Sequence, residues 1–145
     1  MNDIGNPRGT NMKYQLQQKI QDILDQCVDM TVATLRPDSA APQATVVSFV
    51  YDGLIIYFVC GASSQKVVNI AHDPRVAVTV TPPYGDWNEI EGLSFFGTAE
   101  VVTDAKELFK IGGLVQRRFP QIDQFGPVAA DEIKFIRGTL STSQY

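Results

Sequence analysis

Two serines and a lysine lie together in the short polar segment GASSQK, residues 61–66. The segment follows a very apolar run, residues 54–60, with the length and β-branched content of a buried strand, and leads into an expected helix at residues 65–71. The hydroxyl of Ser63 or Ser64 suits the N-cap of that helix, where backbone N–H groups lack partners and the helix dipole is positive. Lys66 is electrostatically unfavourable there by about 0.3–1 kcal/mol unless an anion lies between. Together these groups indicate a phosphate site.

A simpler interpretation of the same segment is a solvated Lys66 beside an ordinary serine cap. The segment also differs from the P-loop pattern, which needs a second glycine directly before the lysine. Gln65 takes that position here, so a nucleoside triphosphate is not the expected ligand. Lys106, at the start of another expected helix, follows no such loop and serves as an internal control.

Length and charge narrow the function classes. The 145 residues predict a loose arm at residues 1–10 and one folded domain over residues 11–145. The net charge of −4 and the isoelectric point near 4.8 argue against nucleic acid or an anionic membrane as the main partner. The N-terminal segment lacks the apolar stretch of a signal peptide. Cys27 and Cys60 have no metal or redox spacing, so we interpret them as buried free thiols of a cytoplasmic protein.

Hydrophobic periodicity predicts six strands, at residues 30–35, 43–51, 54–60, 75–81, 90–102 and 132–139. Helices are expected at residues 12–27, 65–71 and 104–119, and a loop at residues 120–130. Asp52-Gly53, between the second and third strands, is a tight-hairpin signal and cannot form a parallel crossover. Three strands also precede the first internal helix. This order favours a small antiparallel barrel of α+β type over a doubly wound parallel sheet.

Four segments resemble a known family: MTVATLRPD at residues 30–38, ATVVSFVYDG at 44–53, LIIYFVCGASSQKVVNIAHDPRVAVTV at 54–80 and GTAEVV at 97–102. The third is the most specific, because an apolar strand leads through a Ser-x-Lys loop into a helix that ends in Asp-Pro-Arg-Val. Together the segments resemble the FMN-binding split barrels of the pyridoxamine 5′-phosphate oxidase type. The resemblance implies a six-stranded antiparallel split β-barrel with flanking helices.

The resemblance further implies a homodimer with two FMN sites between the subunits. Ser64 and Lys66 would occupy the phosphate-binding positions, with Gln65 between them. Cys60 and Gly61 would flank the phosphate loop, and Trp87 or Gly92 would approach the flavin from the partner subunit. The strand whose backbone lines the isoalloxazine ring would carry Thr45, Val46, Val47 and Ser48.

This chain departs from the family pattern at several positions. Gln65 replaces a frequent arginine, and Ala44 and Phe49 stand where the oxidases carry basic residues, so weaker phosphate binding is expected. The first hairpin loop, residues 38–42, is one residue longer than the family's Asp-Gly-x-Pro and lacks its glycine. We expect this longer loop to avoid a positive φ. The basic C-terminal segment that grips pyridoxal phosphate is not evident, so vitamin B6 oxidation is not expected.

Other chemistry-bearing residues give weaker signals. His72 is the one histidine, so neither a metal site nor a Ser-His-Asp triad is expected. Arg75 is interpreted as an ion-pair or interface residue. Phe95 and Phe96 point to opposite faces of one strand, so one is expected in the core and the other in a dimer interface. Trp87 either shields a flavin or anchors its own loop.

The leading hypothesis is an FMN-dependent oxidoreductase that acts on an unidentified small molecule, with no catalytic side chain indicated. A deazaflavin is the alternative cofactor, because it too carries a phosphate and a tricyclic ring. The alternative function is a flavin- or haem-type ligand-binding protein without turnover, either a carrier or a sensor. A nucleic-acid-binding barrel is disfavoured by the acidic charge.

Overall fold

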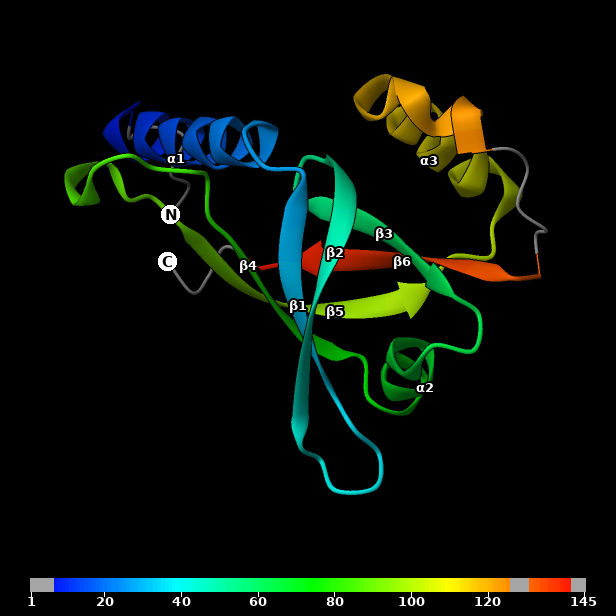
Figure 1. The fold of residues 1–145 in the computed structure, drawn as a ribbon. Helices are drawn as coiled ribbons and strands as arrows, with labels where there is room; N and C mark the ends of the chain where they lie inside the picture. The colour runs from blue at the N-terminus through cyan, green and yellow to red at the C-terminus, as the bar shows by residue number, and fades with distance from the viewer. Residues whose placement is uncertain (1–6, 126–130, 142–145) are drawn as a thin grey trace.

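Six antiparallel strands close into a barrel in a computed structural model that describes residues 7–125 and 131–141 (Figure 1). Around the barrel the strands follow the order β1, β2, β3, β6, β5, β4. The predicted six-stranded antiparallel barrel of α+β class is confirmed. In chain order, the strands are β1 (Asp29–Leu35), β2 (Pro42–Asp52), β3 (Ile55–Gly61), β4 (Arg75–Val80), β5 (Leu93–Val101) and β6 (Ile133–Leu140).

The described residues also form three α-helices and two short 3-10 helices. Helices α1 and α3 lie along one side of the barrel, and α2 lies on the opposite side (Figure 1). No helix within the described ranges is both long and apolar enough to cross a bilayer. The helices are α1 (Pro7–Asp25), α2 (Gln65–His72), α3 (Ala105–Arg118), η2 (Trp87–Glu89) and η3 (Pro120–Phe125).

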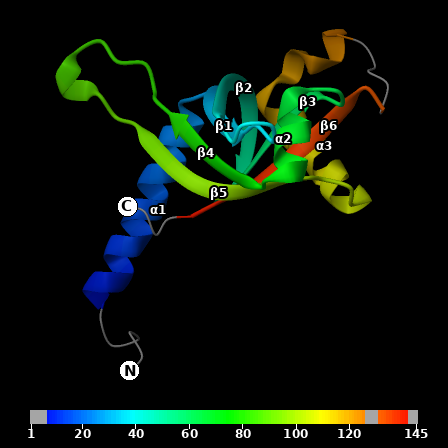
Figure 2. The same cartoon turned by 90° about the horizontal axis from the view of Figure 1, so that it is seen from below.

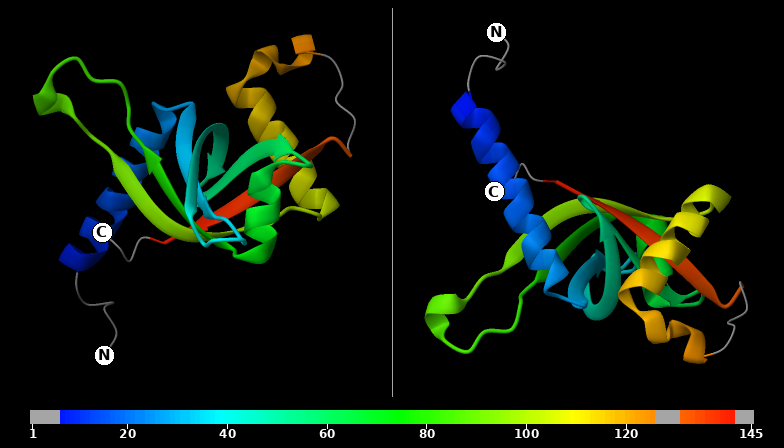
Figure 3. Two further views of the ribbon diagram at one scale, coloured as in Figure 1. Left: turned by 60° about the horizontal axis from the view of Figure 1, so that its bottom comes forward. Right: turned by 90° about the horizontal axis from the view of Figure 1, so that it is seen from above.

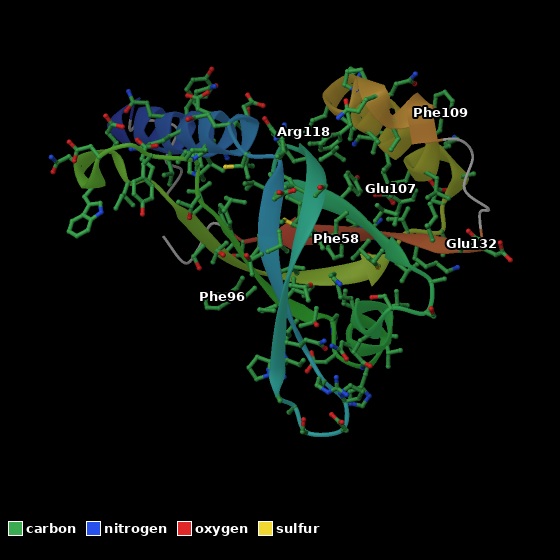
Figure 4. The ribbon with its side chains drawn as sticks, in the orientation of Figure 1. Phe58, Phe96, Glu107, Phe109, Arg118 and Glu132 are labelled. Atoms are coloured by element: carbon green, nitrogen blue, oxygen red, sulfur yellow. The ribbon has the colours of Figure 1, made fainter. Side chains whose placement is uncertain are left out.

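Alternation along the strands builds the core. Val76, Val78 and Val80 of β4 all point inward and are at most 6% exposed, as their spacing predicts. On β5, Phe95 is 1% exposed while its neighbour Phe96 is 57% exposed and points away from the barrel (Figure 4). The C-terminal half of α1 covers one end of the barrel with Ile20, Ile23 and Leu24, and Cys27 joins them just after the helix ends.

Helix α3 packs on the outer face of β2 and β3 and forms a second, smaller core. Its Ile111 is fully buried against Val50 and Tyr57. The Tyr57 hydroxyl donates a hydrogen bond of 2.9 Å to Glu107, which also pairs with Arg137 of β6. At the other end of α3, Arg118 donates to the carbonyl of Leu24 and so links α3 to α1 (Figure 4).

Two element boundaries lie three or more residues from their predicted positions, and the 3-10 helix η3 occupies the first half of the loop predicted at residues 120–130. Helix α1 begins at Pro7, so residues 7–10 of the expected arm are helical, and the rest of that arm lies outside the described residues. A proline is tolerated there because the first N–H groups of a helix lack intrahelical partners. Strand β5 begins at Leu93, not at residue 90, because Asp86 caps the 3-10 turn η2 and delays the strand.

The hairpin loops show one confirmed prediction and one that is wrong. Gly53 has φ +61°, the left-handed conformation that the tight turn after Asp52 requires. The β1–β2 loop was expected to avoid a positive φ, yet Ala40 has φ 56°. Its N–H donates to the carbonyl of Arg36 at 2.8 Å, and the Arg36 N–H donates to the carbonyl of Ala41 at 3.0 Å. Closing this hydrogen-bonded turn places an alanine in a region that costs about 1–2 kcal/mol.

Candidate functional site

The first turn of α2 is organised by Ser64. Its side-chain oxygen accepts a hydrogen bond of 3.1 Å from the backbone N–H of Lys66, and its own N–H donates to the carbonyl of Gly61 at 2.9 Å. The predicted serine cap is therefore confirmed at Ser64, while Ser63 is exposed. The Ser64 oxygen can donate as well as accept, and the side chain also hydrogen-bonds the sulfur of Cys60.

Lys66 supplies positive charge at this helix start. Its side chain is half-buried, and no carboxylate in the described part of the chain pairs with it. Burial raises the pKa of the Cys60 thiol, and the positive charge of Lys66 opposes that rise, as does a hydrogen bond with Ser64. The ammonium group is therefore close enough to Cys60, at the end of β3, to act on its thiol, as the phosphate-site hypothesis requires.

Strands β2 and β3 separate beside this helix start. They pair only from Phe49 opposite Phe58 to Asp52 opposite Ile55. Beyond that point β3 continues alongside β6 as far as Gly61, while β2 continues alongside β1 as far as Pro42. The barrel is therefore split between the first half of β2 and the last residues of β3.

The split leaves one edge of β2 with free backbone groups. The β1–β2 register is unbroken, and the Phe49 N–H donates to the carbonyl of Val28 at 3.1 Å. Because backbone groups alternate in direction along a strand, Ser48, Val46 and Ala44 direct their N–H and C=O groups to the opposite edge. No strand of the described residues pairs with them there. This edge can hydrogen-bond a flat polar ring.

A buried asparagine fixes α2 against the β1–β2 hairpin. Asn69 is completely buried, and its amide nitrogen donates to the hydroxyl of Thr34 at 2.9 Å and to the amide oxygen of Gln43 at 3.1 Å. Gln65 in turn donates to the Asn69 amide oxygen at 2.8 Å. The sequence analysis missed Asn69. Its signal is a polar amide directly before Ile70 on the apolar side of a short helix.

The predicted side chains on β2 have different environments. Thr45 has a buried hydroxyl oxygen without a hydrogen-bond partner among the described residues, a state that costs about 1–3 kcal/mol. Val47 packs against the core, whereas Val46 is 68% exposed on the outer face. The Ser48 hydroxyl donates to Asp29 at 2.9 Å and is therefore already engaged. Of these side chains, the hydroxyl of Thr45 is the polar group that the described residues leave unpaired.

The two positions where the oxidases carry basic residues hold uncharged side chains in this structure. Ala44 is exposed on β2, and Phe49 is buried in the core. Arg75 follows α2 but is held by Asp73 at 2.7 Å, which confirms its predicted ion pair. Its hydrogen bonds lower the pKa of Asp73 to about 2. Lys66 is therefore a cation at this corner that no carboxylate of the described residues pairs with.

Trp87 and Gly92 do not reach this corner within one protomer. Both belong to the β4–β5 connection, which projects from the barrel far from α2 (Figure 2). Trp87 is 84% exposed, so it does not anchor its own loop. The same loop and the N-terminal half of α1 extend from the barrel as two separate arms (Figure 3). Their approach to a partner's flavin stays a prediction.

The groups at this corner are suited to binding a ligand. Groups of three or more metal-ligating side chains are absent from the described ranges. Cys27 is buried and Cys60 half-buried, and both are free thiols. The arrangement combines an anion-binding helix start, a free strand edge and a buried hydroxyl. It can hold a phosphorylated molecule with a flat hydrogen-bonding ring.

A closed antiparallel barrel that splits beside such a helix start defines the class: a split β-barrel with a corner suited to an anionic ligand. The family model described as pyridoxamine 5′-phosphate oxidase matches residues 16–140. The chain belongs to this family. No curated protein matches the sequence.

Solved structures share this fold. A conserved hypothetical protein from Mycobacterium tuberculosis is 28% identical, with a TM-score of 0.69 over 83% of this chain and 77% of that one. A haem storage protein from Vibrio cholerae is 16% identical, with a TM-score of 0.69 over 87% of this chain and 90% of that one. An FAD-binding protein from Mesorhizobium loti is also 16% identical, with a TM-score of 0.69 over 86% of this chain and 89% of that one. The last two likenesses concern the fold alone.

Proposed function

We propose that this protein binds FMN at the split between β2 and β3 and is an oxidoreductase for a small organic molecule. The observation that carries the proposal is the start of α2, where Ser64 and Lys66 follow the end of β3 while the same helix contacts Gln43 on the half of β2 that leaves β3. Family membership and the FAD-binding protein of the same fold support a flavin ligand. The two free thiols support a reducing, cytoplasmic location.

Different groups of the protein hold the phosphate and the ring of the cofactor. The Ser64 hydroxyl, the N–H groups of the first turn and the Lys66 ammonium hold the phosphate, and each charge-assisted bond contributes about 1.5–3 kcal/mol. The free edge at Ala44, Val46 and Ser48 hydrogen-bonds the flavin ring and sets its orientation. FMN supplies the electron-transfer chemistry when bound, and the chain supplies binding and orientation. Gln65 acts through Asn69 by keeping α2 in place.

The proposed assembly is a homodimer. Small or apolar residues form one row across four strands of the outer face, because the register places Ala44, Ala33, Ala77 and Phe96 side by side. Phe96 is 57% exposed at the end of this row, and Val46 lies one row away. A second copy that covers this face would bring its own Trp87 loop toward the flavin. Phe96→Glu is expected to convert the dimer to a monomer in light scattering, and an unchanged mass would exclude this face.

The FMN site is tested by matched lysine variants. Lys66 and Lys106 each occupy the second position of a helix behind a side-chain cap, but only Lys66 lies at the split. Lys66→Ala is expected to weaken FMN binding at least tenfold in a fluorescence-quenching titration, while Lys106→Ala leaves it within twofold. Riboflavin has the same ring without the phosphate, so its affinity should not change in Lys66→Ala. Equal FMN affinity in both variants would exclude the phosphate assignment.

Two alternatives remain as separate proposals with their own readouts. A flavin- or haem-binding carrier or sensor without turnover is favoured by the haem storage protein of the same fold. Reduction of bound FMN by NADH or NADPH, followed by reoxidation with a panel of acceptors, separates an enzyme from a carrier. Parallel titrations with haemin and with a deazaflavin rank these ligands against FMN. Tighter binding of either one would replace FMN as the cofactor.

A further inference from the structure

An apolar cavity of about 220 Å³ lies between the outer face of the barrel and the segment formed by α3 and η3. Val115, Phe119 and Ile122 line it from α3 and its C-terminal extension, and Val59 and Phe135 line it from β3 and β6. Sequence periodicity gave no sign of this cavity, because its two walls lie far apart along the chain.

The lining of the cavity restricts the chemistry of a ligand. None of its lining residues is charged, and an anion or cation would lose its hydration there without a partner. Two of its polar side chains are already engaged, since Ser48 donates to Asp29 and Tyr57 donates to Glu107. Gln121 is the remaining polar side chain in the lining. The cavity therefore suits a neutral apolar group with at most one polar substituent.

The size of the cavity indicates a single ring. Engineered apolar cavities of about 150 Å³ bind benzene, so about 220 Å³ holds a substituted six-membered ring. The cavity also adjoins the split in the barrel. Phe49 opposite Phe58 is the last β2–β3 pair before the strands separate. Ser48 and Val59 lie directly beyond that pair, and both belong to the cavity lining. A ring bound there lies beside the strand edge assigned to the flavin.

We propose that this cavity is the substrate pocket and that it takes a neutral, single-ring aromatic or alicyclic compound rather than a phosphorylated or carboxylated one. The substrate role rests on the proposed flavin function, whereas binding of the ring to the cavity does not. Phosphate recognition is confined to the start of α2, on the other side of the split.

The test uses toluene and benzoate as neutral and anionic single-ring probes of the ligand-free protein, followed by 1H–15N correlation spectra. Toluene is expected to shift the amide signals of Val59, Val115 and Phe135 saturably, and benzoate to bind at least tenfold more weakly. Val59→Phe should weaken toluene binding at least tenfold by filling the cavity. Val28→Phe, an exposed valine outside the lining, is the matched control and should stay within twofold.

Several outcomes would overturn the proposal. Shifts that do not saturate, equal binding of benzoate, or no effect of Val59→Phe would each show that the cavity is not a site for neutral rings. Displacement of toluene by FMN would assign the cavity to the cofactor instead of the substrate. A protein that binds toluene but not FMN would overturn the proposed flavin function and the substrate role together, while supporting the cavity as a binding site.

Discussion

Helices α2 and α3 begin in the same way but differ in the charge around their first turns. Each has a side-chain cap that accepts a backbone hydrogen bond, Ser64 from Lys66 and Asp104 from Glu107. Each also carries a lysine at its second position. Yet α3 has two carboxylates at its start, whereas the first turn of α2 contains no acidic residue.

The partners of these groups explain the difference. At α3, Glu107 accepts from Tyr57 and pairs with Arg137, so the charges are balanced within the chain. At α2, the cap is neutral and the lysine has no acidic partner among the described residues. A helix start whose charges are paired within the chain has a structural role. One that is left positive beside a free strand edge suits a bound anion.

The largest loss of stability is expected from Asn69→Ala, which removes the anchor of α2. Three hydrogen bonds disappear, and the hydroxyl of Thr34, a residue that is 1% exposed, loses its partner. The free energy of unfolding in urea should fall by about 2–4 kcal/mol, because each buried group left unsatisfied costs about 1–3 kcal/mol. FMN affinity should fall as well. Asn88→Ala, in the exposed turn η2, is the control, and a loss below about 1 kcal/mol would show that Asn69 does not hold α2.

Removing Glu107, which anchors α3, should lower the stability less than Asn69→Ala does and leave FMN binding unchanged. Glu107→Ala is expected to lower the free energy of unfolding by about 2 kcal/mol at neutral pH, because Tyr57 and Arg137 both lose a charged partner. Glu100→Ala removes the more exposed partner of Arg137 and should cost well under 1 kcal/mol. A drop in FMN affinity in Glu107→Ala would contradict a purely structural role for this helix start.

The carboxylate of Glu107 at the start of α3 also makes the stability of the protein depend on pH. Hydrogen bonds from Arg137 and then Tyr57 lower the pKa of Glu107 below its ordinary value. A carboxylate with a lowered folded-state pKa stabilises the protein above its unfolded-state pKa and loses that contribution as pH falls through the folded value. The difference in stability between the wild type and Glu107→Ala should therefore be constant near neutral pH and shrink in acid. A difference that grows on acidification would contradict the assignment.

Removing either helix cap should lower the free energy of unfolding by the same amount, but only the cap of α2 should affect FMN binding. Ser64→Ala and Asp104→Ala each remove one cap and should each lower the free energy of unfolding by about 1 kcal/mol. Only Ser64→Ala should also weaken FMN binding, because only its hydroxyl faces the proposed phosphate. The measurements are urea unfolding and flavin fluorescence on the same samples. Weaker FMN binding in both variants would remove the distinction between the two helix starts.

A small gain in stability is expected from Gly113→Ala in α3. An added Cβ meets nothing within 4 Å, so the change should raise stability by up to about 1 kcal/mol through helix propensity. FMN affinity should not change. Gly97→Ala is the contrasting variant, because its Cβ would collide with the carbonyl of Thr139 and lower the melting temperature. Destabilisation by Gly113→Ala would show that α3 needs its glycine.

Local patterns in the sequence determined the strands, the hairpin at Asp52-Gly53, the Ser64 cap and the position of Lys66 in the first turn of α2. These features depend on side-chain period, on glycine's freedom at positive φ and on hydrogen bonds between residues a few positions apart, all of which can be read along the chain. The left-handed Ala40 was missed because a hydrogen-bonded turn overrode the preference of the residue itself.

Only the tertiary structure decided where the barrel splits, what holds α2 in place and where the cavity lies. Strand β2 leaves β3 because β3 continues with β6, which is distant in sequence, and Asn69 is satisfied by Thr34 and Gln43 from a different hairpin. The Trp87 loop likewise lies far from α2 although it follows α2 closely along the chain. Contacts of this kind depend on the packing of whole elements against one another, and no short segment of sequence encodes them.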